Sequence, residues 1–212
     1  MKKTMKSTVV RILLAVIACT LFLSAALAGS STEGGYVPSN DSGLSSSLNS
    51  LPPFKFAKHK NGIGCGSCPV YSAPSKDSYR CANGKASCQT NSKMDEAGFV
   101  NGWLLVRYET NNGDMRVGYI PPKYVKGFRS SMAPHFGYVP AVADEVINVT
   151  DNPMSHNGSF AQLDEGESFA VISKYTYHQK QGLAWWYIEC TVDGQTARGF
   201  IEMDSNFHLG ND

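Results

Sequence analysis

Short apolar segments alternate with clusters of Gly, Asn, Asp and Pro from residue 54 to the C-terminus. No stretch of this region repeats its apolar residues with the period of an amphipathic helix. The clearest pair of apolar segments is 102–108 and 115–120, and Asn112-Gly113 lies between them. Both turn residues tolerate the positive φ that a tight β-hairpin requires. The pattern therefore predicts an all-β fold of short strands joined by turns.

A second hairpin downstream repeats the first. Segments 184–191 and 196–201 flank Asp193-Gly194, which again favours a tight turn. The hairpins align at matching positions, namely Trp103 with Trp185, Val106 with Ile188, and Gly118-Tyr119-Ile120 with Gly199-Phe200-Ile201. Each follows a strand and a Pro-containing turn, at 68–74 and 146–153, and the repeat spacing is about 80 residues. We predict two small β domains, 59–128 and 138–209; chance similarity of two hairpins is the alternative.

Strand periodicity assigns the faces of these hairpins, because alternate residues of a strand share a face. The residues that we assign to the two cores are Leu104, Val106, Tyr108, Trp186, Ile188 and Cys190. Cys190 takes the place of Tyr108 in the alignment, so we expect it to be a buried and inert thiol. The opposite face carries Trp103 and Leu105 in the first hairpin and Trp185 and Tyr187 in the second.

The N-terminus has the three parts of a secretory signal peptide. Lys2, Lys3, Lys6 and Arg11 give it a positive start, residues 12–28 carry no charge, and Ala26-Leu27-Ala28 offers small residues for cleavage. We predict a signal peptide at 1–28 and a secreted or cell-envelope protein outside the cytoplasm. One alternative is a retained membrane helix, for which the uncharged run is at the lower limit of length. The other is a lipoprotein at Cys19, which lies within the apolar run instead of at its end.

The segment after the signal peptide has the composition of a flexible linker. Residues 29–58 predict a tether, since Ser, Gly, Asn and Pro dominate 29–53 and leave little apolar surface to bury. Cleavage would remove four basic residues and no acidic one, which changes the formal net charge from +1 to −3. Without a strong basic field, nucleic acid is not an expected partner.

Four cysteines, Cys65, Cys68, Cys81 and Cys88, lie close together in the sequence. An even local cluster in an exported chain favours disulfides, and the spacing does not choose among the three possible pairings. A redox Cys-x-x-Cys site and a zinc site are the alternatives. The first lacks the surrounding strand-to-helix pattern, and the second would require two closely spaced pairs.

These segments resemble bacterial SH3-type domains of exported cell-wall proteins. The resemblance rests on Tyr71-Ser72-Ala73-Pro74, Gly102-Trp103-Leu104-Leu105-Val106 and Gly118-Tyr119-Ile120-Pro121, and, more divergently, on Asn152-Pro153, Ala184-Trp185-Trp186-Tyr187-Ile188 and Gly199-Phe200-Ile201. It implies two small, partly open SH3-like β-barrels in tandem, and a binding role against peptidoglycan. Such domains commonly accompany wall hydrolases, whereas no catalytic domain is recognisable in this chain.

Catalytic patterns are weak. The five histidines lie in polar or turn segments, and no metal-ligand pair, Cys/His couple, phosphate loop or dinucleotide fingerprint occurs. The acidic pairs at 95–96, 144–145 and 164–165 have the character of solvated turns. We therefore expect no enzyme activity, no catalytic residue, no cofactor and no metal.

Aromatic residues are the candidates for binding, because flat rings stack on sugars and on extended peptides. The candidate ligand-binding residues are Trp103, Tyr119, Tyr71, Trp185 and Tyr187, with Tyr124, Tyr175 and Tyr177 as possible extensions. The alternative is that these rings pack between the two barrels or complete the core of each barrel. We expect an exported non-enzymatic binding protein for peptidoglycan or another cell-envelope glycan or peptide. A protein-interaction module without wall affinity is the second hypothesis.

Overall fold

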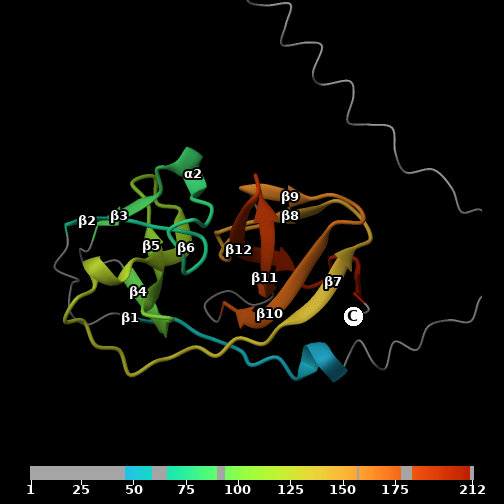
Figure 1. Ribbon diagram of the computed structural model, residues 1–212, viewed down its shortest axis with the longest axis horizontal. Coiled ribbons are helices and arrows are strands. Elements are labelled where there is room, and N and C mark those ends of the chain that lie inside the picture. The colour runs from blue at the N-terminus through green and yellow to red at the C-terminus, as the bar shows by residue number, and fades with distance from the viewer. Residues whose placement is uncertain (1–45, 59–65, 90–93, 157, 178–182, 211–212) are drawn as a thin grey trace, which may run out of the picture. The chain divides into compact units, whose positions relative to one another are not determined.

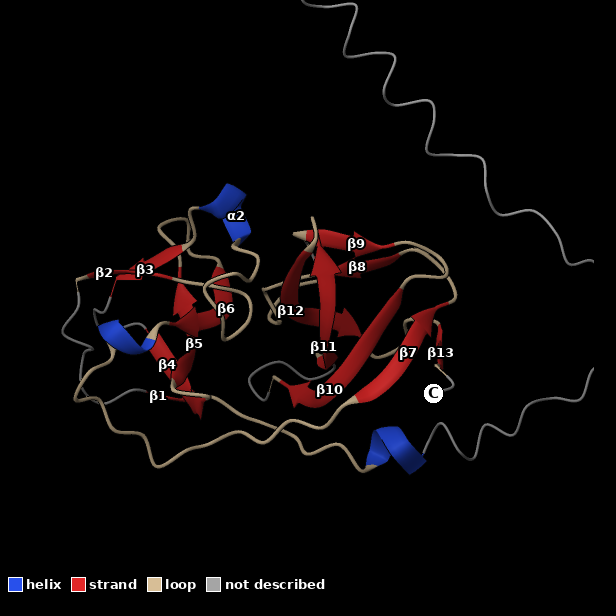
Figure 2. Ribbon diagram, in the orientation of Figure 1, coloured by secondary structure: helices blue, strands red, loops and turns tan. Residues whose placement is uncertain are grey.

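The computed structural model describes residues 46–58, 66–89, 94–156, 158–177 and 183–210, which belong to one compact unit. These residues form several antiparallel sheets (Figures 1 and 2), and the described strands do not close into a barrel. The all-β prediction is confirmed. The predicted signal peptide, residues 29–45 of the tether and Cys65 lie outside the described residues. In the described ranges, no helix is long and apolar enough to span a bilayer.

The first β region comprises residues 66–125 together with the short preceding strand β1. Its main sheet has the strand order β1-β4-β5-β6, with β1 at Ala57–Lys58, β4 at Met94–Val100, β5 at Trp103–Glu109 and β6 at Met115–Ile120. A two-stranded ladder joins β2 (Ser67–Pro69) to β3 (Ser87–Gln89). Two helical segments of about one turn accompany these strands, namely α2 (Cys81–Gly84) and the 3-10 helix η1 (Pro122–Tyr124).

The second β region comprises residues 139–209. Its main sheet has the order β12-β11-β10-β7-β13, with β7 at Val139–Ala143, β10 at Ser168–Thr176, β11 at Ala184–Val192, β12 at Gln195–Glu202 and β13 at Phe207–Leu209. A second two-stranded ladder joins β8 (Ile147–Val149) to β9 (Ala161–Leu163). Both regions therefore combine one long meander with one short ladder.

Strand register repeats between the two regions. Val106 of β5 lies opposite Gly118, and Ile188 of β11 lies opposite Gly199. The preceding strand carries an irregularity in each region, between Glu96 and Gly98 in β4 and between Val171 and Ser173 in β10. The sequence alignment of Trp103 with Trp185 therefore matches residues with equivalent pairing partners.

In both regions a glycine allows another chain segment to cross close to a strand. Isolated bridges join Tyr71 to Tyr119 and Thr150 to Phe200, directly beside Gly118 and Gly199. A Cβ on Gly118 would lie 2.8 Å from the Tyr71 carbonyl oxygen, and one on Gly199 would lie 3.0 Å from that of Thr150. The crossing segment can approach β6 and β12 this closely because neither position has a side chain.

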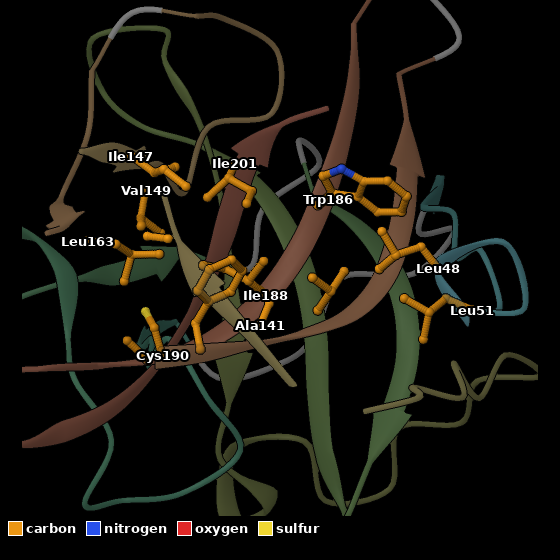
Figure 3. Packing of buried hydrophobic residues seen from close by; sticks show 14 residues of the cluster. Leu48, Leu51, Ala141, Ile147, Val149, Leu163, Trp186, Ile188, Cys190 and Ile201 are labelled. Carbon is orange, nitrogen blue, oxygen red and sulfur yellow. The ribbon is translucent and has the colours of Figure 1, made fainter. Parts of the chain in front are cut away.

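Burial confirms the assignment of faces. Leu104, Val106 and Tyr108 belong to the core of the first β region. Trp186, Ile188 and Cys190 belong to the core of the second, which Figure 3 shows. Cys190 is a buried free thiol, as predicted. Burial raises its pKa to about 12, so the thiol is protonated at neutral pH.

The end of the predicted tether differs from expectation. Residues 46–49 form a helical turn, and Leu48 and Leu51 are buried in the core of the second region, near Trp186 (Figure 3). Phe54 is also buried, and its backbone N–H donates to the Lys174 carbonyl at 3.3 Å. The tether prediction is wrong for residues 46–58, because three apolar side chains in a polar segment are enough to anchor it.

A shared core joins the two regions. It contains side chains from β5 and β6 together with others from β10, β11 and β12, and Phe54 lies among them. Each region also contributes an arginine to the other. Arg107 pairs with Asp95 and donates from Nη1 to the Tyr175 hydroxyl at 2.9 Å. Arg198 pairs with Glu189 at 2.8 Å and donates to the Tyr119 hydroxyl at 2.9 Å.

Candidate functional site

The aromatic candidates face one another instead of solvent. Trp103, Tyr119, Trp185 and Tyr187 belong to the shared core and expose between 0% and 7% of their surface, and Tyr71 packs against them half-buried. The Tyr187 and Tyr119 hydroxyls are 3.3 Å apart. The strand pattern correctly placed these rings opposite the two cores, but an exposed aromatic patch is wrong. The alternative, packing between the two regions, is what the structure has.

Trp185 differs from the other candidates, because it also lines a surface pocket. The pocket has a volume of about 270 Å³ and lies where the ends of β11 and β12 meet β8 and the loop after it. Its described lining residues are Glu145, Val146, Ile147, Asn148, Thr150, His156, Gly158, Trp185, Glu202, Asp204 and Ser205. We refer to this site as the Trp185 pocket.

Two differences between the repeats distinguish the surroundings of Trp185 from those of Trp103. Tyr71 and Thr150 make equivalent bridges, to Tyr119 and Phe200. The Tyr71 ring lies edge-on against Trp103, with ring centroids 5.3 Å apart, whereas the small Thr150 lines the open pocket beside Trp185. After the shared Gly-aromatic-Ile segment, the first region has a proline and the second has Glu202, which pairs with Trp185 across the sheet.

The loop after β8 supplies His156. Two hydrogen bonds between residues two positions apart form its first turn. The Thr150 hydroxyl accepts from the Asn152 N–H at 3.0 Å, and the Asn152 side-chain oxygen accepts from the Met154 N–H at 3.2 Å. His156 Nδ1 then lies 2.6 Å from Glu202 Oε1. The imidazole ring also lies over the Trp185 ring, with centroids 5.2 Å apart and planes 31° apart. His156 therefore covers the aromatic wall of the pocket.

The pocket is acidic. Glu145, Glu202 and Asp204 line it, and none of its described lining residues is Lys or Arg. Glu145 accepts a hydrogen bond from the Asn206 N–H at 3.3 Å, which holds one carboxylate at the edge of the site. A ligand in this pocket would lie close to several carboxylates, which attract a cationic group and repel an anionic one.

An unpaired donor lies in the pocket wall. Trp185 exposes only 2% of its surface, and its buried Nε1 has no hydrogen-bond partner among the described residues. Buried indole N–H groups usually have a partner, since an unsatisfied donor costs free energy. The pocket therefore combines acceptors at its edge with a lining residue, Trp185, whose indole donor is unused.

Three of the four clustered cysteines come together in the core of the first region. Cys68, Cys81 and Cys88 are buried there, and Cys68 lies opposite Cys88 between β2 and β3. Cys81 and Cys88 are free thiols, so the predicted bridges through these two residues are not present. One physical reason is that the Cys81 thiol lies against Asp151 of the second region.

Burial also determines the reactivity of these thiols. It raises the pKa of Cys88 to about 12, and burial together with the charge of Asp151 raises the pKa of Cys81 still further. Thiols of this kind are poor nucleophiles at neutral pH, because the thiolate is the reactive form. Among the described residues, no three His, Cys, Asp or Glu side chains are grouped to hold a metal ion.

Sequence reasoning identified Trp185 but missed the rest of its pocket. His156, Thr150 and Glu202 lie in three separate segments, and each has an ordinary polar or strand context. The available signal was the alignment itself, in which Thr150 and Glu202 are the positions where the second repeat departs from the first. Comparison with protein-family models, with curated proteins and with solved structures finds no match to this chain.

Proposed function

We propose that this chain is an exported, non-enzymatic binding protein with two SH3-like units in tandem, and that it engages peptidoglycan or another cell-envelope ligand through the Trp185 pocket. The observation that carries the proposal is the pocket itself, where a predicted binding aromatic meets open space lined by charged groups. The N-terminal pattern of a signal peptide supports an extracytoplasmic site of action. The repeated register supports the tandem arrangement.

The geometry favours recognition of a small group over stacking along a chain. Four of the five candidate rings are in the shared core, so they cannot lie flat on a glycan. Ligand pockets commonly measure roughly 300–1,000 Å³, and the Trp185 pocket, at about 270 Å³, is slightly smaller than that range. A terminal group of a larger polymer fits this size.

Two features support the non-enzymatic part of the proposal. The described free thiols are buried and protonated, as their raised pKa values indicate. His156, the one histidine among the described lining residues of the pocket, contacts a carboxylate and an indole ring instead of a hydroxyl or a thiol. That arrangement suits binding better than activation of a nucleophile.

Retention on purified cell-wall sacculi tests the proposal. We expect the mature chain, residues 29–212, to be retained at low salt, and the double variant Glu202→Gln/Asp204→Asn to be released. Glu165→Gln is the matched control, because it removes one carboxylate from an exposed turn outside the pocket and should leave retention unchanged. If the wild-type chain washes through at low salt, wall binding is wrong.

The second candidate, a protein-interaction module without wall affinity, is favoured by one observation. Burial of Trp103, Tyr119 and Tyr187 removes the rings that a glycan would have used. This candidate expects no retention on sacculi for the wild type and no difference between the wild type and the carboxylate variants in that assay.

A further inference from the structure

We propose that the Trp185 pocket binds the free amino terminus of a peptide, through its ammonium group and the carbonyl oxygen next to it. This inference rests on the proposed function, because it assigns a ligand group to the same pocket. It requires one ligand to use both the acidic edge of the pocket and the unpaired indole N–H of Trp185.

The carboxylates define the first requirement. Glu145, Glu202 and Asp204 can accept hydrogen bonds from an ammonium group, and no described lysine or arginine of the pocket competes for them. Charge-assisted hydrogen bonds of this kind are shorter and stronger than neutral ones. An acylated amine would carry neither the charge nor the three donors.

The Trp185 indole defines the second requirement. Its Nε1–H is a donor without a partner in the described part of the chain, so it needs an oxygen acceptor. An ammonium group has no acceptor to offer. A peptide amino terminus has one, since the first carbonyl oxygen is only a few bonds from the nitrogen, and it can therefore match donor and acceptors together.

His156 occupies the place that this ligand would take. Its ring covers Trp185, and its Nδ1 contacts Glu202, so it already uses the aromatic surface and one acceptor. The side chain is 55% exposed, and its contact with Glu202 is at the surface, where such pairs contribute little to stability. Displacement of His156 would uncover the indole edge and free the Glu202 carboxylate.

The rim of the pocket suits the rest of a peptide. Val146 and Met203 are two of the three most exposed large hydrophobic residues in the described chain, with 56% and 38% of their surface exposed. Val146 lines the pocket, and Met203 lies between the lining residues Glu202 and Asp204. They offer aliphatic contacts to the first side chains after the amino terminus.

Nuclear magnetic resonance provides a direct test, because the chain has three tryptophans and hence three indole N–H signals. The ¹⁵N-labelled mature chain is titrated with tri-alanine amide and, separately, with its N-acetylated form. We expect the Trp185 indole proton to move downfield with the free peptide, as a new hydrogen bond forms. The acetylated peptide should bind at least tenfold more weakly. Trp185→Phe assigns the signal.

Variants of surface residues provide a second test, which does not require the buried-core variant Trp185→Phe to fold. Glu202→Gln/Asp204→Asn should weaken binding of the free peptide at least fivefold. His156→Ala should strengthen this binding, and Glu165→Gln should leave it unchanged. Equal affinities for the free and acetylated peptides would overturn the inference. So would binding that leaves the Trp185 indole signal in place.

Nα-acetyl-lysine amide separates an amino terminus from a bare ammonium group. Binding as tight as that of tri-alanine amide would show that the neighbouring carbonyl is not used, and this would contradict the inference. The two proposals also fail in different ways. Retention on sacculi without a peptide response removes the amino-terminus inference alone, whereas a peptide response without retention removes wall binding alone.

Discussion

Trp103 and Trp185 occupy equivalent places in the two β regions, but Trp103 packs against the Tyr71 ring and Trp185 lines a pocket. Each ring lies at the start of the central strand of its meander and packs into the shared core. Tyr71 lies edge-on against Trp103, while Thr150, its counterpart, leaves space beside Trp185. The scaffold therefore fixes where each tryptophan lies and buries both rings, while the crossing residue decides what packs beside the ring.

Charge separates the two sites further. The residue after the shared isoleucine is Pro121 in the first region and Glu202 in the second. Pro121 leads into η1, whereas Glu202 places a carboxylate opposite Trp185. A similar strand register thus surrounds a tightly packed tryptophan in the first region and a polar pocket in the second.

The largest expected effect comes from the arginines that join the two regions. Arg198→Met should lower the free energy of unfolding by about 3 kcal/mol, because Glu189 and the Tyr119 hydroxyl lose a buried partner. Arg107→Met should cost a similar amount through Asp95 and Tyr175. Urea unfolding measures both. The double variant Arg198→Met/Glu189→Leu should recover most of the loss, and a single variant that unfolds like wild type would show that these pairs do not join the regions.

Glycine at the two crossings gives the next effect. Gly118→Ala and Gly199→Ala should each destabilise by about 1–3 kcal/mol, since the added methyl group would meet the backbone of the crossing segment. Gly113→Ala is a poor control because of its positive φ, whereas Gly210→Ala has normal φ and a looser contact of 3.4 Å. Thermal unfolding should show loss at both crossings and little at Gly210. Loss of stability in only one of these two variants would mean that the two crossings are not packed equivalently.

Opening the first region should make it resemble the second. Tyr71→Thr removes the ring that covers Trp103 and should cost about 2 kcal/mol of stability through the lost ring contact and buried area. Acrylamide should then quench tryptophan fluorescence more strongly than in wild type. Adding Trp103→Phe should abolish the extra quenching. Unchanged quenching in Tyr71→Thr would show that something other than Tyr71 protects Trp103.

The sequence predicted the parts of this comparison that depend on local pattern. Turn residues and alternation located both hairpins, aligned Val106 with Ile188, and assigned Cys190 to a core. Alternation also placed Trp103 and Trp185 on equivalent faces of their hairpins. It could not predict which residues cover these faces, since many of those residues belong to the other region. Leu48 and Leu51 were missed because they are isolated in a polar segment, and His156 because its partner Glu202 is distant in sequence.

The smallest effect on stability, and the sharpest on exposure, is expected from His156→Ala. Its contact with Glu202 is at the surface, where such pairs contribute roughly 0–1 kcal/mol, so the unfolding transition should hardly move. Removing the imidazole should nevertheless uncover Trp185 and increase its quenching by acrylamide. His208→Ala is a matched control, because His208 makes the same 2.6 Å contact with Asp144 at a site outside the Trp185 pocket. Increased quenching in His156→Ala alone would show that this loop residue, and not the shared scaffold, shields the ring. Equal quenching in both variants would mean that His156 does not shield Trp185, and that the packing of the shared core alone keeps the quencher from the ring.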